Sequence, residues 1–184
     1  MRIITGSARG CRLKAPPGEA TRPTADRTRE ALFSMLGSRV MDAQVLDLFA
    51  GTGALALEAL SRGAAHAVMI DRATHDVLVE NARRTKLAQR VELRGDVYGH
   101  AAELARAGRT FDLIFADPPY AKGDALCVLR AVDSGVLLAA DGLFVLEQGA
   151  GEECAEHVGA LSLIRERRYG AARICFYERR EAAI

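Results

Sequence analysis

Two spacings of apolar residues alternate along most of this 184-residue chain. Short, nearly continuous apolar runs are typical of strands buried on both faces, and longer runs with apolar positions three and four residues apart are typical of helices. The predicted strands are Gln44–Ala50, His66–Asp71, Arg90–Asp96, Phe111–Asp117 and Gly142–Gln148. The predicted helices between them are Ala54–Gly63, Thr74–Ala88, Ala101–Gly108 and Ala125–Leu137.

Strands that are joined through helices form right-handed crossovers in a parallel sheet. The pattern then changes, because two extended runs, Ala160–Gly170 and Ala171–Arg180, meet at a glycine with no helix between them. Such a pair is typical of antiparallel strands at one edge of a sheet. The sequence therefore predicts an α/β fold: a Rossmann-like, doubly wound and mostly parallel sheet of seven strands with an antiparallel C-terminal strand pair.

The N-terminal part is organised differently. Residues 2–16 read as two short extended runs around a glycine-containing turn, which predicts a β-hairpin. A helix follows over Thr24–Gly37, with Thr24 as a candidate N-cap and Gly37 able to end it. We expect one domain over residues 1–184, with residues 1–20 as a basic hairpin appendage.

Composition adds limits to this picture. The chain is 49% hydrophobic with a formal net charge of +1, which suits a compact domain with a sizeable core. No apolar run has the roughly 18 residues of a membrane span, and the first ten residues lack the apolar stretch of a signal peptide. We therefore expect a cytoplasmic protein that does not enter the membrane. The four cysteines are far apart without a CxxC pair, so reduced thiols are expected rather than a zinc site or disulfides.

The charges are distributed unevenly. Residues 1–30 carry a net charge of +4 and residues 165–180 also carry +4, whereas the body between them is acidic. Basic segments of this kind can contact the phosphates of a nucleic acid. They can equally be the solvated faces of ordinary elements, and charge alone leaves both interpretations open.

Candidate ligand-binding residues follow the predicted strands, where open α/β sheets bind their ligands. Gly51, Gly53 and Ala56 after the first strand match a G-x-G-x-x-A pattern, which allows a tight turn and close approach of the backbone to a ligand. Asp71 ends the second strand at the spacing that suits a ribose-bearing cofactor, and Asp96 after the third can reach an adenine amine. A plain glycine turn and a helix-capping carboxylate are the alternatives.

A different kind of site follows the fourth strand, in the sequence ADPPY. The two prolines fix the backbone around Asp117. The carboxylate of Asp117 and the carbonyl of Pro118 can each accept a hydrogen of an exocyclic amine, and Tyr120 can stack on the base. The alternative is a helix-breaking loop with a solvated aspartate.

These motifs carry a resemblance to a known family. VLDLFAGTGALALEALSRGA and ADPPY resemble motifs of class I S-adenosylmethionine-dependent methyltransferases that act on amino groups. The resemblance narrows to the bacterial guanine-N2 methyltransferases of small-subunit ribosomal RNA when the segment TRPTADRTREALFSML is added. The resemblance to this family covers nearly the whole chain. Two departures are Asp71, where the family often has Glu, and Ala56, where Gly is common.

The resemblance implies methyl transfer from S-adenosylmethionine to the N2 atom of a guanine in the helix 31 loop of 16S rRNA. We expect a monomer, and no metal ion is expected because the reaction needs none and the sequence has no cluster of histidines. The rRNA would be bound within the small ribosomal subunit or an assembly intermediate. It implies that the cofactor is bound by Asp47, Ala50, Gly51, Gly53, Asp71, Asp96 and Thr24. The guanine would be held by Asp117, Pro118, Pro119 and Tyr120, and the RNA by Arg9, Arg12, Lys14, Arg22 and Arg27.

Four alternatives remain at this point. A DNA adenine-N6 methyltransferase shares the DPPY chemistry but carries a recognition domain for which no insertion here is long enough. A protein glutamine methyltransferase typically has Asn in place of Asp117. An NAD-dependent dehydrogenase or a non-catalytic adenosine-nucleotide binding domain gives the double proline no role.

Overall fold

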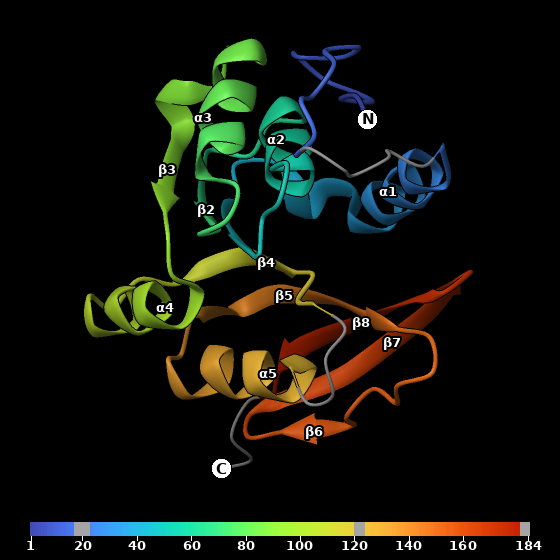
Figure 1. Cartoon of the computed structure of the whole chain (residues 1–184). Coiled ribbons are helices and arrows are strands. Elements are labelled where there is room, and N and C mark those ends of the chain that lie inside the picture. The colour runs from blue at the N-terminus through green and yellow to red at the C-terminus, as the bar shows by residue number, and fades with distance from the viewer. Residues whose placement is uncertain (17–22, 120–123, 181–184) are drawn as a thin grey trace. The chain divides into compact units, whose positions relative to one another are not determined.

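The computed structural model describes residues 1–16, 23–119 and 124–180, and side chains in the first helix from Asp26 onward. The chain divides into two compact units, Met1–Val97 and Tyr98–Ile184 (Figure 1). No helix within the described ranges is long and apolar enough to cross a membrane. The single domain remains a prediction.

The first unit contains three parallel strands with helices between them. Strand β1 pairs with β2 and β2 pairs with β3, so that Leu48 lies opposite Ile70, and Ile70 opposite Arg94. The carboxyl ends of the three strands therefore lie side by side. The elements are α1 (Pro23–Leu36), η1 (Gly37–Val40), β1 (Gln44–Leu48), α2 (Ala54–Ser61), β2 (His66–Ile70), α3 (His75–Arg84), η2 (Ala88–Arg90) and β3 (Val91–Arg94).

Burial explains why these segments form strands and helices. In β1 and β2 every residue after the first is buried, as expected of parallel strands covered on both faces. Helix α2 buries all its residues except Leu55, and its one charged residue, Glu58, is among them.

The N-terminal residues fold back on themselves. Arg2 and Arg12 form an isolated antiparallel bridge, and the amide of Ile3 donates to the carbonyl of Cys11 at 2.9 Å. Residues 1–16 therefore form a hairpin-like turn with a single bridge in place of two regular strands. The predicted boundary at residue 20 lies outside the described residues.

The second unit combines one parallel strand pair with antiparallel strands. Strand β5 pairs in parallel with β4 and antiparallel with β8, β7 pairs antiparallel with β8, and β6 with β7. The elements are α4 (Val97–Arg106, whose first residue belongs to the first unit), β4 (Phe111–Ala116), α5 (Asp124–Ser134), β5 (Leu138–Gly149), β6 (His157–Val158), β7 (Leu161–Tyr169) and β8 (Ala172–Arg179).

The predicted fold class is confirmed, with mostly parallel pairing and an antiparallel C-terminal pair, β7 and β8. The predicted number of strands is wrong, because the described residues form eight strands and not seven. The additional strand is β6, whose two residues are too few to show the alternation of apolar and polar positions.

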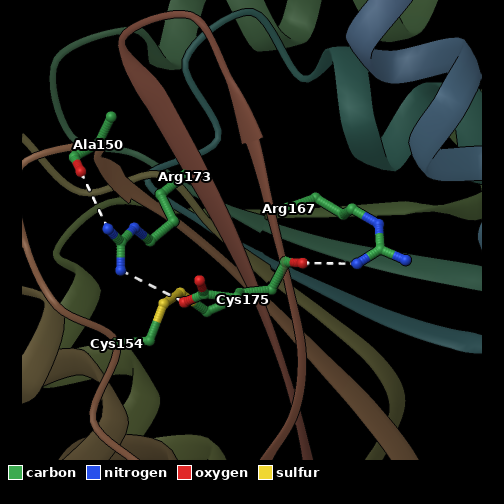
Figure 2. The surroundings of a disulfide bond; sticks show 6 residues. Ala150, Cys154, Arg167, Arg173 and Cys175 are labelled. Atoms are coloured by element: carbon green, nitrogen blue, oxygen red, sulfur yellow. Dashed lines mark hydrogen bonds and ion pairs between the residues drawn. A yellow bond between two sulfur atoms is a disulfide. The ribbon is translucent and has the colours of Figure 1, made fainter.

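The cysteines also depart from expectation. Cys154 and Cys175 form a disulfide, with Cα atoms 6.4 Å apart, which lies within the usual range for such bonds (Figure 2). Cys175 lies in β8, and Cys154 lies in the loop after β5, the strand that pairs with β8. Strand pairing therefore brings together two thiols whose sequence separation of 21 gives no sign of it.

Candidate functional site

The loop after β1 has an unusual backbone. Phe49, Gly51 and Gly53 all have positive φ angles, of 61°, 55° and 74°. A side chain at Gly53 would crowd the core and strain the backbone, because its Cβ would lie 2.9 Å from the sulfur of Met69 and 3.0 Å from Leu78 at a positive φ. At Gly51 the nearest atom to an added Cβ is the carbonyl oxygen of Phe49 at 4.0 Å, so this side of the loop is open. The loop therefore packs against the core at Gly53 and presents backbone to a ligand at Gly51.

The carboxylate of Asp71 fixes this loop to the end of β2. Its Oδ2 accepts the amide of Gly51 at 2.9 Å, and its Oδ1 accepts the amides of Ala73 and Thr74 at 2.8 and 3.1 Å. Asp71 thus organises the glycine loop and the start of α3 together. Each carboxylate oxygen has two lone pairs, so Oδ2 retains one with which it can accept a hydroxyl.

The other predicted cofactor residues of the first unit lie beside this loop or after β3. Asp47 is 3% exposed, and its Oδ2 accepts the amide of Ala56 at 3.2 Å, which satisfies a donor in the first turn of α2. The amide of Ala50 donates to Ile70 at 3.2 Å. Asp96 is exposed in the residues that follow β3. Thr24 lies in α1, but its side chain is outside the described residues.

The predicted base-binding residues follow β4 in the second unit. Strand β4 is buried from Leu113 to Ala116, and Ala116 lies opposite Leu146 of β5. Asp117 is exposed, Pro118 is buried and Pro119 is exposed. A rigid segment anchored by a buried proline therefore carries an accessible carboxylate at the carboxyl end of this strand. Tyr120 lies outside the described residues.

Four of the predicted RNA-contacting side chains, those of Arg9, Arg12, Lys14 and Arg27, are exposed, and Arg22 lies outside the described residues. The first three belong to the N-terminal segment.

Glu58, which sequence analysis missed, holds that segment in place. Glu58 is fully buried, and its carboxylate accepts the amides of Ile4 and Thr5 at 2.7 and 3.0 Å. Arg62 donates to the same carboxylate at 2.7 Å, and Arg29 lies 3.8 Å from it. The sequence does contain one signal: Glu58 is the one charged residue in the largely apolar sequence of α2, and a buried carboxylate needs partners.

Two more buried polar side chains complete the attachment. Ser61 accepts the amide of Ala8 at 2.9 Å and donates to Thr5 at 2.6 Å. The Asn81 carboxamide accepts the amide of Lys14 at 2.7 Å and donates to the carbonyls of Lys14 and Thr52, both at 2.9 Å. Asn81 therefore links the basic N-terminal segment directly to the glycine loop, which contains Thr52.

Comparison with known proteins identifies the α/β fold with its glycine loop as that of a methyltransferase. The model of the family described as "Conserved hypothetical protein 95" matches residues 1–178, so the chain belongs to this family. Ribosomal RNA small subunit methyltransferase D of Escherichia coli (strain K12) is 35% identical over 181 residues, 97% of this chain and 90% of that protein. YlbH of Bacillus subtilis (strain 168) is 36% identical over 183 residues, 98% of this chain and 100% of that protein. The solved structure of yhhF from Escherichia coli has a TM-score of 0.84 and 36% identity, with 97% of both chains covered.

Proposed function

We propose that this protein transfers a methyl group from S-adenosylmethionine to the exocyclic N2 atom of a guanine in 16S rRNA, as a monomer in the cytoplasm. The observation that carries the proposal is the pair of features at strand ends: the open glycine loop tied to Asp71, and the accessible Asp117 followed by two prolines. The substrate class is supported by the Escherichia coli relative, which is named a ribosomal RNA small subunit methyltransferase.

The residues of the first unit fit the proposed cofactor. Among the described residues, the Phe49 carbonyl oxygen alone comes within 4.0 Å of a Cβ added at Gly51, so a ligand can approach the loop there. Asp71 stands at the end of β2 with acceptor capacity for ribose hydroxyls, although its Oδ1 already accepts two amides. When bound, S-adenosylmethionine supplies a methyl group on a positively charged sulfur atom.

The ADPPY segment would supply the activation of the target nitrogen. The lone pair of an exocyclic amine is delocalised into the base, which makes this nitrogen a poor nucleophile. Asp117 and the Pro118 carbonyl each accept one N–H and so favour the pyramidal nitrogen, whose lone pair is free to attack a carbon atom. The nitrogen would gain one bond to the methyl carbon while the bond of that carbon to the cofactor sulfur breaks and leaves a neutral thioether. The methylated nitrogen would then release one proton, which the Asp117 carboxylate would accept. Tyr120 would stack on the base and orient it.

The experiment that tests these roles compares the variants Asp117→Asn and Asp117→Ala with the wild type. We expect both to lose at least about 100-fold in kcat on rRNA, the usual contribution of a positioned acid or base. The Kd for S-adenosylmethionine, measured by calorimetry, should stay within about twofold of the wild-type value, because the proposed role of Asp117 is to bind the base and not the cofactor. The variant Asp112→Asn is the control, since it removes an exposed carboxylate near the other end of the same strand. Normal turnover without Asp117 would refute the assigned chemistry.

A further inference from the structure

Strand β7 has an exposed edge that carries positive charge. Strand β8 pairs along one side of β7, but on the other side β6 pairs only with Leu161 and Ser162. Beyond Leu163, whose amide donates to Glu156, no described strand lies against this side. Residues 164–168 are all exposed, in the sequence IRERR. We refer to Arg165, Arg167 and Arg168 as the β7 basic edge.

The arginines of the β7 basic edge are not neutralised by neighbouring carboxylates. The one acidic residue within the run, Glu166, forms an ion pair at 3.3 Å with Arg173 of β8. Arg167 donates to the backbone carbonyl of Glu166 at 2.9 Å, which leaves its charge uncompensated (Figure 2). Arg165 and Arg168 have no ion pair or side-chain hydrogen bond with a described residue. Three permanently protonated guanidinium groups therefore face solvent.

The three arginines project from both faces of the strand pair. Arg165 and Arg167 lie opposite Phe176 and Ile174, whereas Arg168 lies opposite Arg173, so they alternate across the sheet. Figure 2 shows the side chains of Arg167 and Arg173 on opposite sides of the strand pair. A strand rises about 3.3 Å per residue, so the run spans about 10 Å along the edge. The edge can therefore offer donors to more than one phosphate of a chain that passes along it.

Charge at a sheet edge also has a simpler role, because it discourages pairing with another strand. A charge of either sign serves that role. Three cations without carboxylate partners among the described residues additionally complement a polyanion. The guanidinium group binds phosphate oxygens through two parallel hydrogen bonds, which a lysine ammonium cannot do.

We propose that the β7 basic edge binds the phosphate backbone of the RNA substrate, as a contact separate from the N-terminal segment. This inference rests on the proposed function, since it assigns a second contact surface for the same substrate. Phosphate contacts position an RNA without reading its bases. The edge therefore contributes to affinity and orientation, and the choice of the target base is left to other residues.

The test replaces the three arginines together, as Arg165→Gln, Arg167→Gln and Arg168→Gln. The matched control makes the same change to Gln at Arg83, Arg106 and Arg130. These arginines are also exposed and make no ion pair with a described residue. Binding of naked 16S rRNA is measured over a series of salt concentrations. Each phosphate contact with a single strand contributes about 0.7 to the slope of log K against log salt. We expect the slope of the test variant to be about 2 smaller.

Steady-state kinetics provide a second test. Arginines that only stabilised the fold would not change the KM for rRNA alone. The test variant should raise the KM for rRNA and leave kcat and the Kd for S-adenosylmethionine unchanged, while the control variant resembles the wild type.

An unchanged salt slope in the test variant, with wild-type methylation of rRNA intact, would overturn the inference and leave the proposed function standing. An equal loss in the control variant would also overturn it, because the effect would then belong to total charge. A loss seen only with assembled subunits, and not with naked rRNA, would also overturn the inference, because the edge would then depend on a feature that naked rRNA lacks. Absence of methyl transfer by the wild type to any RNA would instead refute the proposed function.

Discussion

The clearest energetic prediction concerns Glu58, the buried carboxylate that attaches the N-terminal segment to α2. Burial lowers the pKa of the Arg29 guanidinium, whereas Glu58 and Asp26 act to raise it. A guanidinium remains charged inside a protein, so Arg29, which is 4% exposed, depends on these carboxylates. The variant Glu58→Gln keeps the shape of the side chain and removes its charge.

The magnitude follows from the contacts. In Glu58→Gln one carboxylate oxygen becomes an amino group, and that group must face either the amide of Ile4 or that of Thr5, both of which are donors. Loss of one hydrogen bond to a charged group costs about 1.5–3 kcal/mol. Removing one partner of a buried ion pair costs about 3–5 kcal/mol, and the two losses overlap because they share one carboxylate. We therefore expect the free energy of unfolding to fall by about 3–5 kcal/mol.

Urea unfolding followed by circular dichroism measures this loss, and hydrogen exchange at the amides of Ile4 and Thr5 locates it. The exchange should accelerate at these two amides more than in β1. The control is Glu80→Gln, which makes the same chemical change in an exposed pair with Arg84 at 2.7 Å and should leave stability nearly unchanged. A loss below about 1 kcal/mol for Glu58→Gln, as for an exposed pair, would refute the reasoning.

Two further predictions concern the second unit. Burial raises the pKa of Tyr177 to about 12, with a smaller contribution from the Glu166 carboxylate. An unfolded tyrosine titrates near pH 10, so the stabilisation from neutral Tyr177 is complete below about pH 10 and is lost as the pH rises towards 12. Ultraviolet titration of the folded protein should show a late phenolate that Tyr177→Phe removes; its absence in the wild type would contradict the burial argument. The Cys154–Cys175 disulfide closes a loop with a sequence separation of 21, so Cys154→Ser should lower the unfolding free energy by about 3 kcal/mol under oxidising conditions. Reductant should destabilise the wild type alone, and equal sensitivity of both proteins would mean that the bond does not form in solution.

Most of the fold could be predicted because each element carries a strong local pattern. Strands β1 and β2 are short and apolar because they are buried on both faces. The pair β7 and β8 was predictable from two extended runs around Gly170, which has a φ of 61°. Strand β6 was not, since its two residues form a strand only through their pairing with Leu161 and Ser162.

The candidate site was predictable only where spacing along the chain carries the information. Gly51 and Asp71 are 20 residues apart, and the structure joins them by a hydrogen bond of 2.9 Å. Asn81 and Lys14 are 67 residues apart, and nothing in their sequence context indicates that they meet. The roles of Asp117 and of the RNA-contacting arginines are proposals that the variants described above test.

The most direct test of the account is methyl transfer from labelled S-adenosylmethionine, followed by nucleoside and amino-acid analysis of the product. Unmodified small ribosomal subunits, naked 16S rRNA, duplex DNA and a protein fraction are supplied in parallel. The account predicts N2-methylguanosine in 16S rRNA, offered alone or within the subunit, and no label in DNA or protein. N6-methyladenosine in DNA, methylated glutamine in protein, or no label in any substrate would contradict it.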